Sequence, residues 1–365
     1  MPKLLIIVYK RPGSVLDGGD VVCRRNIEAL EGVLGLGNVD VMYIHDGGTG
    51  TMSRIAGAFH FLSNHFYGLT PKRTAEIVDR AMGYDYMWLD RSVFGIIAHK
   101  ARLAGYKGRI LCFFHNIETV YFDAKLPRWL PGRRIVLRCV RRNDAYCCSD
   151  ADTVVALTER DSEGLLNLYG RKADFIVPVM FKDRYATDCY PTESIPSKPL
   201  CVFLGSFFPA NVEGIEWFVR EVYPKVDITL KIVGKGMDQL NVIGKEWLDP
   251  EIEVISDAPQ LEPYFIEADI MIIPIFKGSG MKVKTCESLM FGKNILATDE
   301  AWVGYDLDYN RAGGRCNEPS EYIQRINDLA GANVPRFNAY SREMFLEKWS
   351  DSRAPGLFKR ILGVD

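Results

Sequence analysis

The sequence lacks the common signatures of metal centres and of disulfide-bonded domains. Its nine cysteines form no CxxC pair, and several lie inside apolar runs such as Leu111-Cys112-Phe113, which is typical of thiols in a reducing compartment. The five histidines show no HxxxH spacing, so the sequence predicts no dedicated transition-metal site. We therefore expect neither a required metal nor another resident cofactor.

Long apolar runs and a large net charge are also missing. No run is long enough to span a bilayer, and the formal net charge of −2 over 365 residues gives no sign of a nucleic-acid partner. The chain runs directly into the apolar segment 4–9, which is typical of a strand rather than of a signal-peptide core. We expect a cytoplasmic protein that at most contacts the inner face of a membrane.

What the sequence does contain is a repeated alternation of short apolar strands and helical segments. The strands lack a strict apolar–polar alternation, which indicates parallel sheets covered by helices on both faces. The pattern extends to about residue 182, gives way to a polar stretch with three prolines at 183–199, and restarts at 200. This predicts an α/β protein with two doubly wound, Rossmann-like domains, 1–182 and 200–349, joined by a linker at 183–199.

Ligands of such sheets bind beyond the carboxyl ends of the strands, so we expect the site in a cleft between the domains. The strongest candidate follows the apolar strand predicted at 270–274 and opens a helix predicted from Met281 to Phe291. Free N–H groups and the helix dipole favour an anion there, and Lys282 and Lys284 add positive charge.

Glu287 lies about one turn further along this helix, where its carboxylate could accept hydrogen bonds from sugar hydroxyls. Positive charge for a diphosphate together with a carboxylate for a ribose is the chemistry that a nucleotide-sugar site requires. The alternative is an ordinary surface ion pair, because Lys284 and Glu287 are spaced i,i+3.

The loop after the first strand carries Gly18 and Gly19 at the start of a predicted helix. Glycines there allow a phosphate or a sugar to approach the backbone closely; the alternative is a surface turn in which Asp20 caps the helix. The loop contains neither GxGxxG nor a GK[ST] sequence, so it is neither a dinucleotide-binding fingerprint nor a P-loop.

Two further segments follow predicted strands directly. His115 comes after the strand 109–114 and could donate to a sugar hydroxyl, although an isolated histidine is as often structural. Gly205 and Ser206 end the first strand of the second domain, where a tight turn is the alternative.

The segment 125–142 has seven basic residues and no acidic one. Arg134, Arg138, Arg141 and Arg142 share a helix face, and Trp129 lies among the basic residues. Such a segment suits an anionic membrane surface or a lipid-diphosphate acceptor. The alternative, which we favour, is a solvated helix face whose apolar side packs in the core.

In its order of segments the chain resembles the GT-B glycosyltransferases of the retaining family four, the glycosyl transferases of group 1. The resemblance covers nearly the whole length. It rests on Gly18-Gly19, His115-Asn116-Ile117-Glu118, 151–161, 203–206 with 211–218, 278–284 and, most specifically, 287–298.

This resemblance implies that Lys282 and Lys284 contact the donor diphosphate, that Glu287 binds the ribose hydroxyls, and that His115 contacts the donor sugar. It also implies that the helical segment 350–365 returns to the first domain. Two departures are present: Ser279 stands where many members carry a glutamate, and Ser206 and Asn211 occupy the region of the usual arginine and lysine. The implied donor-binding set is completed by Gly18, Gly19, Gly205, Ser206, Ser279, Gly280 and Met281.

The implied function is sugar transfer from a nucleoside-diphosphate sugar, UDP- or GDP-linked, to a glycan or lipid-linked acceptor in cell-surface polysaccharide synthesis. Anomeric configuration would be retained, with the diphosphate charge stabilised by lysines and helix N–H groups rather than by a metal. A nucleotide-sugar 2-epimerase and a catalytically inactive nucleotide-sugar-binding homologue keep the same fold and remain alternatives. A solute receptor is disfavoured by the missing export signal, and a dehydrogenase by the missing GxGxxG.

Overall fold

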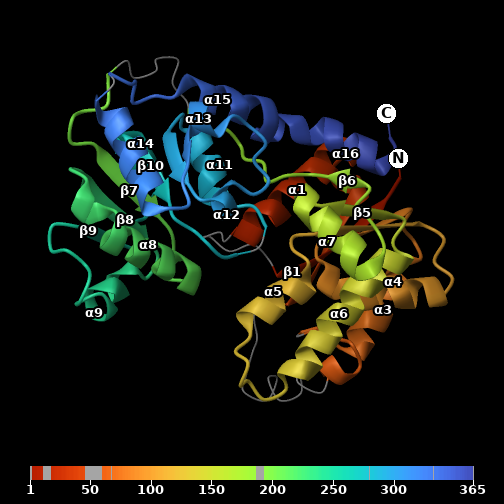
Figure 1. The fold of residues 1–365 in the computed structure, drawn as a ribbon. Helices are drawn as coiled ribbons and strands as arrows, with labels where there is room; N and C mark the ends of the chain where they lie inside the picture. Colours follow the sequence, from red (N-terminus) through yellow and green to blue (C-terminus); the bar gives the residue numbers. More distant parts are fainter. Residues whose placement is uncertain are drawn as a thin grey trace. The chain divides into compact units, whose positions relative to one another are not determined.

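The computed structural model describes residues 2–10, 18–45, 60–66, 68–185, 193–278, 280–331 and 333–364. The chain divides into two compact units, residues 1–180 with 352–365 and residues 181–351. Each is built on a six-stranded sheet in which every pairing is parallel (Figure 1). The prediction of two doubly wound α/β units is confirmed. The described residues of 183–199 group with the second unit.

The first unit has the strand order β2-β1-β3-β4-β5-β6. Its central strands are buried on both faces, as the uninterrupted apolar runs predict. The strands are β1 (Leu4–Lys10), β2 (Val39–His45), β3 (Tyr86–Leu89), β4 (Arg109–Phe114), β5 (Thr153–Ala156) and β6 (Phe175–Ile176). The α-helices are α1 (Gly18–Leu34), α3 (Pro71–Ala81), α4 (Gly95–Leu103), α5 (Glu118–Lys125), α6 (Arg133–Asp150), α7 (Glu159–Tyr169) and α16 (Ala354–Leu362).

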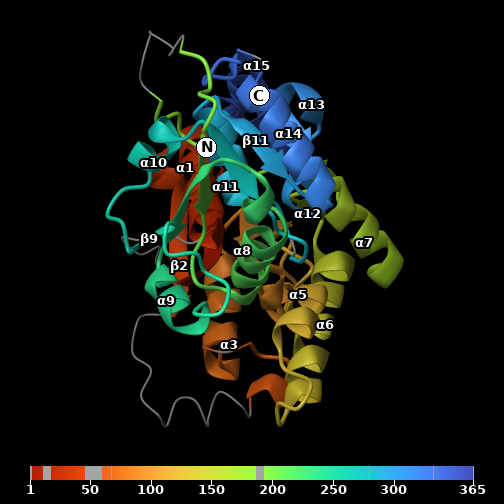
Figure 2. The ribbon, with the colours of Figure 1, turned by 60° about the vertical axis from the view of Figure 1, so that its left-hand side comes forward.

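Local sequence sets the ends of these helices. Helix α7 begins where the Thr158 hydroxyl accepts a hydrogen bond from the Asp161 N–H, and it ends at Gly170 in the left-handed conformation. Helix α5 runs alongside α6 in both views of the ribbon (Figure 1 and Figure 2). The segment that the sequence predicts as a helix at 53–67 lies mostly outside the described residues; of its described part, 60–62 are helical.

The last helix, α16, belongs to the first unit although the second unit separates it in sequence. It packs beside α1, and the ring of Phe358 stacks on Trp88 at a centroid distance of 5.5 Å. The Leu362 carbonyl accepts a hydrogen bond of 2.7 Å from Arg109 Nη1. An apolar face and hydrogen bonds from Tyr86 and Arg109 to backbone carbonyls therefore tie the end of the chain to strands β3 and β4.

The second unit has the strand order β12-β11-β10-β7-β8-β9. Its strands are β7 (Leu200–Leu204), β8 (Thr229–Gly234), β9 (Glu253–Ser256), β10 (Ile270–Ile273), β11 (Asn294–Ala297) and β12 (Gly313–Arg315). Its α-helices are α8 (Pro209–Glu221), α9 (Leu240–Ile243), α10 (Glu262–Glu267), α11 (Val283–Met290), α12 (Asp299–Trp302), α13 (Tyr309–Ala312), α14 (Pro319–Gly331) and α15 (Ala339–Met344), and a π-helical turn follows at Phe345–Trp349.

At the carboxyl end of this sheet two pairs of backbone segments approach each other so closely that no side chain fits between them. A Cβ atom on Gly214 of α8 would lie 1.9 Å from the Pro274 carbonyl oxygen, just after β10. A Cβ on Gly234 would lie 1.9 Å from the carbonyl oxygen of Gly205, just after β7. Glycine is needed at both positions because no side chain fits, and these contacts fix the edge where the candidate site is built.

The boundaries of two helices of the second unit differ from the predictions by a few residues. The helix predicted at Met281–Phe291 begins at Val283, because Lys282 has extended backbone and is the residue before the first turn. The helix predicted at 259–268 is reduced to α10, Glu262–Glu267. These shifts of a few residues leave the strand–turn–helix order intact.

Candidate functional site

Lys284 is the second residue of α11 and lies at the carboxyl edge of the second sheet. Its Nζ donates a hydrogen bond of 2.9 Å to Asn211 Oδ1 and lies 4.5 Å from the ring centre of Phe203. Asn211 is held in turn, because its amide donates to the Ser206 carbonyl at 2.8 Å. No carboxylate of the described residues lies within ion-pair distance of Lys284. Among these residues, its ammonium is therefore contacted by neutral groups, the Asn211 amide and the Phe203 ring.

Burial and, to a smaller extent, the nearby charge of Lys282 lower the pKa of Lys284 to about 7, while Glu287 acts in the opposite direction. A half-buried cation without a counter-ion is costly in the ligand-free protein. An anion that reached the ammonium would raise its pKa again and be bound in return. Such perturbed groups are typical of functional sites.

Lys282 has a different environment. Its Nζ lies 2.7 Å from Glu300 Oε1 and donates to the Gly280 carbonyl at 3.0 Å. Its own carbonyl accepts a hydrogen bond of 2.8 Å from the Tyr305 hydroxyl. The structure thus separates the two lysines: Glu300 neutralises Lys282, which shapes the turn before α11, whereas Lys284 keeps an unneutralised charge.

Glu287 follows Lys284 by one turn of α11 but does not pair with it. Its Oε1 lies 2.5 Å from Arg184 Nη2, and Arg184 Nη1 lies 2.5 Å from Glu262 Oε1. The alternative of a Lys284–Glu287 surface ion pair is therefore wrong. Burial raises the pKa of Glu287, Arg184 opposes that shift, and Glu262 adds to it.

The backbone around Lys284 is shaped for this lysine. A Cβ atom on Gly205 would lie 2.8 Å from Lys284 Nζ. Any larger residue at position 205 would therefore displace the ammonium. Gly280 adopts a positive φ of 64°, which permits the turn before α11, and the next residue, Met281, is buried. The predicted site residue Ser279 lies outside the described residues.

In the first unit, His115 follows β4 directly and is 3% exposed. Its Nε2 lies 3.2 Å from Asp90 Oδ2, and its Nδ1 is buried with no hydrogen-bond partner among the described residues. Asp90 follows β3 and also accepts from the Asn26 amide at 2.7 Å and from the Trp88 indole at 3.3 Å. The two neighbouring strands therefore place a buried carboxylate–imidazole pair at their carboxyl ends.

Burial lowers the pKa of His115, so its imidazole is neutral near pH 7. Although burial opposes it, hydrogen bonds from His115, Asn26 and Cys23 hold the pKa of Asp90 below its ordinary value. An ionised carboxylate only accepts, so Nε2 carries the proton and Nδ1 keeps its lone pair. We expected His115 to donate to a sugar hydroxyl; its one unpaired ring nitrogen can only accept.

The other predicted residues of the first unit lie at the start of α1. Gly18 and Gly19 are its first two residues. Asp20 lies inside the first turn rather than capping the helix, and its Oδ2 is 3.3 Å from Lys10 Nζ at the end of β1. The alternative in which Asp20 caps this helix is therefore wrong.

Sequence reasoning missed Asp90 and Arg184. Asp90 carries the signal that singled out His115, a polar residue directly after a buried strand. Arg184 gave no signal, because it lies in a polar stretch without periodicity and its partner Glu287 is 103 positions away.

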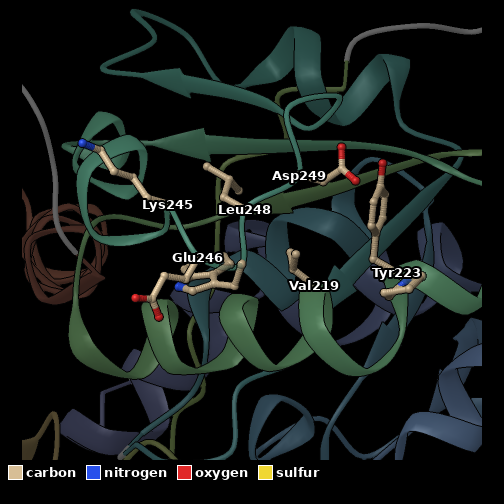
Figure 3. A pocket seen from close by; sticks show the side chains of 8 residues that line it. Val219, Tyr223, Lys245, Glu246, Leu248 and Asp249 are labelled. Atoms are coloured by element: carbon tan, nitrogen blue, oxygen red, sulfur yellow. The ribbon is translucent and has the colours of Figure 1, made fainter.

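A hollow of about 250 Å³ elsewhere in the second unit is not part of this site. Figure 3 shows it with Lys245 at one end and Tyr223 and Asp249 at the other. It lies where β8 and β9 begin, at the amino edge of the sheet, and is smaller than an ordinary ligand pocket. In the part of the chain that the structure describes, no group of three or more His, Cys, Asp or Glu side chains could hold a metal ion, and no helix is both long and apolar enough to cross a membrane.

The two parallel α/β units define a class of fold, the GT-B fold. Solved structures of that class cover essentially the whole chain. HepE from Anabaena, in complex with UDP and glucose, matches with a TM-score of 0.67 at 12% identity over 100% of both chains. Sucrose-phosphate synthase from Thermosynechococcus elongatus matches with a TM-score of 0.68 at 12% identity over 99% of this chain and 98% of that one. The lipopolysaccharide outer core galactosyltransferase WaaB matches with a TM-score of 0.67 at 14% identity over 99% of both chains.

The sequence itself places the second unit in a family. Residues 198–331 match the family Glycosyl transferases group 1. No curated protein matches the sequence. The segment 198–331 is thus a glycosyl transferases group 1 domain within a GT-B fold, which confirms the prediction of a GT-B glycosyltransferase.

Proposed function

We propose that this glycosyltransferase moves a sugar from a UDP- or GDP-linked donor to a glycan or lipid-linked acceptor, with retention of anomeric configuration. The observation that carries the proposal is Lys284, a cation held only by neutral groups one turn before Glu287. Retention is supported by the resemblance to the retaining family four. HepE, bound to UDP and glucose, and the lipopolysaccharide galactosyltransferase WaaB support the donor class and a role in surface polysaccharide synthesis.

In this proposal the donor diphosphate accepts hydrogen bonds from Lys284 Nζ and from the free N–H groups at the start of α11. As the bond to the sugar breaks, negative charge grows on the diphosphate, and a fixed cation stabilises that charge without reorganisation. Lys282 keeps the turn in place through Glu300. Glu287 accepts hydrogen bonds from the ribose, and His115 Nδ1 accepts one from a hydroxyl of the donor sugar.

The test is turnover with a panel of nucleoside-diphosphate sugars, measured as released nucleoside diphosphate, on wild type and Lys284→Ala. Loss of one preorganised charge contact should lower turnover by about 10²–10³-fold. Lys277→Ala is the matched control, because Lys277 is an exposed lysine of the preceding turn that pairs with Glu213. Equal turnover in wild type and Lys284→Ala would remove Lys284 from the mechanism.

Product analysis separates the remaining alternatives. Proton NMR of the first product should show the anomeric configuration of the donor, and an inverted product would contradict retention. Conversion of one nucleotide sugar into its 2-epimer without any acceptor would identify the epimerase instead. Tight donor binding with no product under any acceptor would identify an inactive homologue.

We also propose that the segment 125–142 contacts an anionic membrane that carries a lipid-linked acceptor. Val140 packs in the core, as a solvated helix with an apolar inner side requires, but Trp129 remains 80% exposed and Ile135 39% exposed. Exposed arginines accompany them at positions 128, 134, 138, 141 and 142. An exposed indole among cations is the composition of an interfacial membrane contact.

Co-sedimentation with vesicles tests this surface. Binding to vesicles of phosphatidylglycerol and phosphatidylcholine should exceed binding to phosphatidylcholine alone. Each neutralised cation contributes about 1 kcal/mol near an anionic surface, so reversing Arg134 and Arg138 to Glu should abolish most of the difference. The control Arg220→Glu on α8 should change nothing; equal binding of all variants would refute the contact.

A further inference from the structure

Arg184 joins two carboxylates across the second unit. Its Nη2 lies 2.5 Å from Oε1 of Glu287 on α11, and its Nη1 lies 2.5 Å from Oε1 of Glu262 at the start of α10. The guanidinium is thus fixed on two sides by charged partners, which leaves it little freedom. Glu287 is 14% exposed at its side chain, so the carboxylate is shielded but within reach of a ligand.

The residues on either side of Arg184 are anchored as firmly. Asp183 pairs with Arg342 of α15, with Nη1 and Oδ1 2.8 Å apart, and the same Nη1 donates to the carbonyl of Met290 at the end of α11. The ring of Tyr185 lies 5.6 Å from that of Phe291. Arg184 is therefore held against α11 by its neighbours as well as by its own ion pairs.

This arrangement leaves one half of the Glu287 carboxylate open. Arg184 occupies Oε1, whereas Oε2 takes no hydrogen bond from the residues that the structure describes. A carboxylate that must bind the two hydroxyls of a ribose has to keep a set orientation and its charge. The groups that face it are Arg184, Glu262, Lys284 and the phenol of Tyr305, and Arg184 is the cation in contact.

We propose that Arg184 is a positioning residue for ribose recognition: it holds Glu287 by Oε1, is itself braced by Glu262, and leaves Oε2 to receive the ribose hydroxyls. The inference rests on the proposed donor site and adds to it a residue from the segment in which the chain enters the second unit. Arg184 touches no donor atom in this account; it acts through Glu287.

The test compares a ribose with a deoxyribose ligand. Calorimetry would give the affinities of UDP and 2′-deoxy-UDP, or of the GDP pair if GDP binds better, for wild type and variants. Wild type should prefer the ribose ligand. Since a hydrogen bond to a charged group contributes about 1.5–3 kcal/mol, Glu287→Gln and Arg184→Met should each lower that preference by about tenfold or more.

Matched variants separate positioning from general damage. Arg184→Lys should keep part of the ribose preference, because the charge remains. Lys284→Ala should weaken both ligands alike and leave their ratio unchanged. Arg220→Met, which removes an arginine of a surface pair with Glu216, should behave as wild type. Added to Glu287→Gln, Arg184→Met should reduce the preference no further, since both act on one contact.

Three results would overturn the inference. In the first, Arg184→Met retains the wild-type ribose preference. In the second, Arg184→Met binds the ribose ligand more tightly than wild type, which would make Arg184 a competitor of the ribose. In the third, the effect of Arg184→Met adds fully to that of Glu287→Gln. A wild type that binds no nucleoside diphosphate would instead refute the donor site itself, and the inference with it. Melting curves of each variant would show whether it folds; if Arg184→Met does not, Arg184→Lys decides, because an unchanged ribose preference together with an unchanged contribution of Glu287 would overturn the inference.

Discussion

Binding of a nucleoside diphosphate at pH 8 should take up close to one proton from solution. With a pKa of about 7, Lys284 is mostly neutral at that pH in the ligand-free protein. Contact with a diphosphate should return its pKa toward the ordinary lysine value of about 10.4, so binding moves about 0.9 proton onto the side chain. The terminal phosphate, with a pKa of about 6, is already ionised at pH 8 and releases none.

The sign of the pH dependence follows from the same shift. Below pH 7 Lys284 is charged before binding, so affinity does not depend on its titration. Above pH 7 the neutral amine must take up a proton on binding, and affinity should fall by up to about tenfold per pH unit until the pKa of the complex is reached. At pH 6 the lysine should contribute only about 0.1 proton.

Calorimetry in Tris and in HEPES at pH 8 measures the number of protons, because the observed enthalpy varies with the ionisation enthalpy of the buffer. We expect about 0.9 proton for wild type and for Lys277→Met, and close to zero for Lys284→Met if it binds at all. Glu287→Gln should keep the uptake. Tight binding by wild type without proton uptake, or equal uptake by Lys284→Met, would refute the role given to this lysine.

Three further outcomes are expected. Gly205→Ala should weaken nucleotide affinity by about tenfold or more without unfolding the protein, because the new Cβ would lie 2.8 Å from Lys284 Nζ; calorimetry would show this, with Gly356→Ala as the control because its Cβ meets nothing within 4 Å. Gly214→Ala should destabilise the second unit by about 3 kcal/mol or more, because its Cβ would lie 1.9 Å from the Pro274 carbonyl oxygen; an unchanged urea unfolding midpoint would show that the backbones can separate cheaply. Turnover should survive an excess of EDTA, and complete loss that magnesium restores would contradict a diphosphate site built on lysine and helix N–H groups.

Much of the fold was predictable because its signals are local. Uninterrupted apolar strands between helical segments indicate covered parallel sheets, and the carboxyl ends of such strands are where ligands bind. That rule drew attention to His115, Gly205 and the turn before Lys284 without any knowledge of contacts. The same rule applied to the strand ending at Leu89 would have identified Asp90.

The sequence by itself therefore determined the two α/β units, the edge of each sheet on which to look, and the lysine and glutamate of α11. Only the tertiary structure decided which charges meet. The i,i+3 spacing allows Lys284 and Glu287 to pair with each other, but packing brings other partners closer. Lys284 contacts Asn211 instead, and Glu287 pairs with Arg184. Such partners lie far apart in sequence and are brought together by the packing of strands, turns and helices at one edge of the sheet, so no local pattern encodes them.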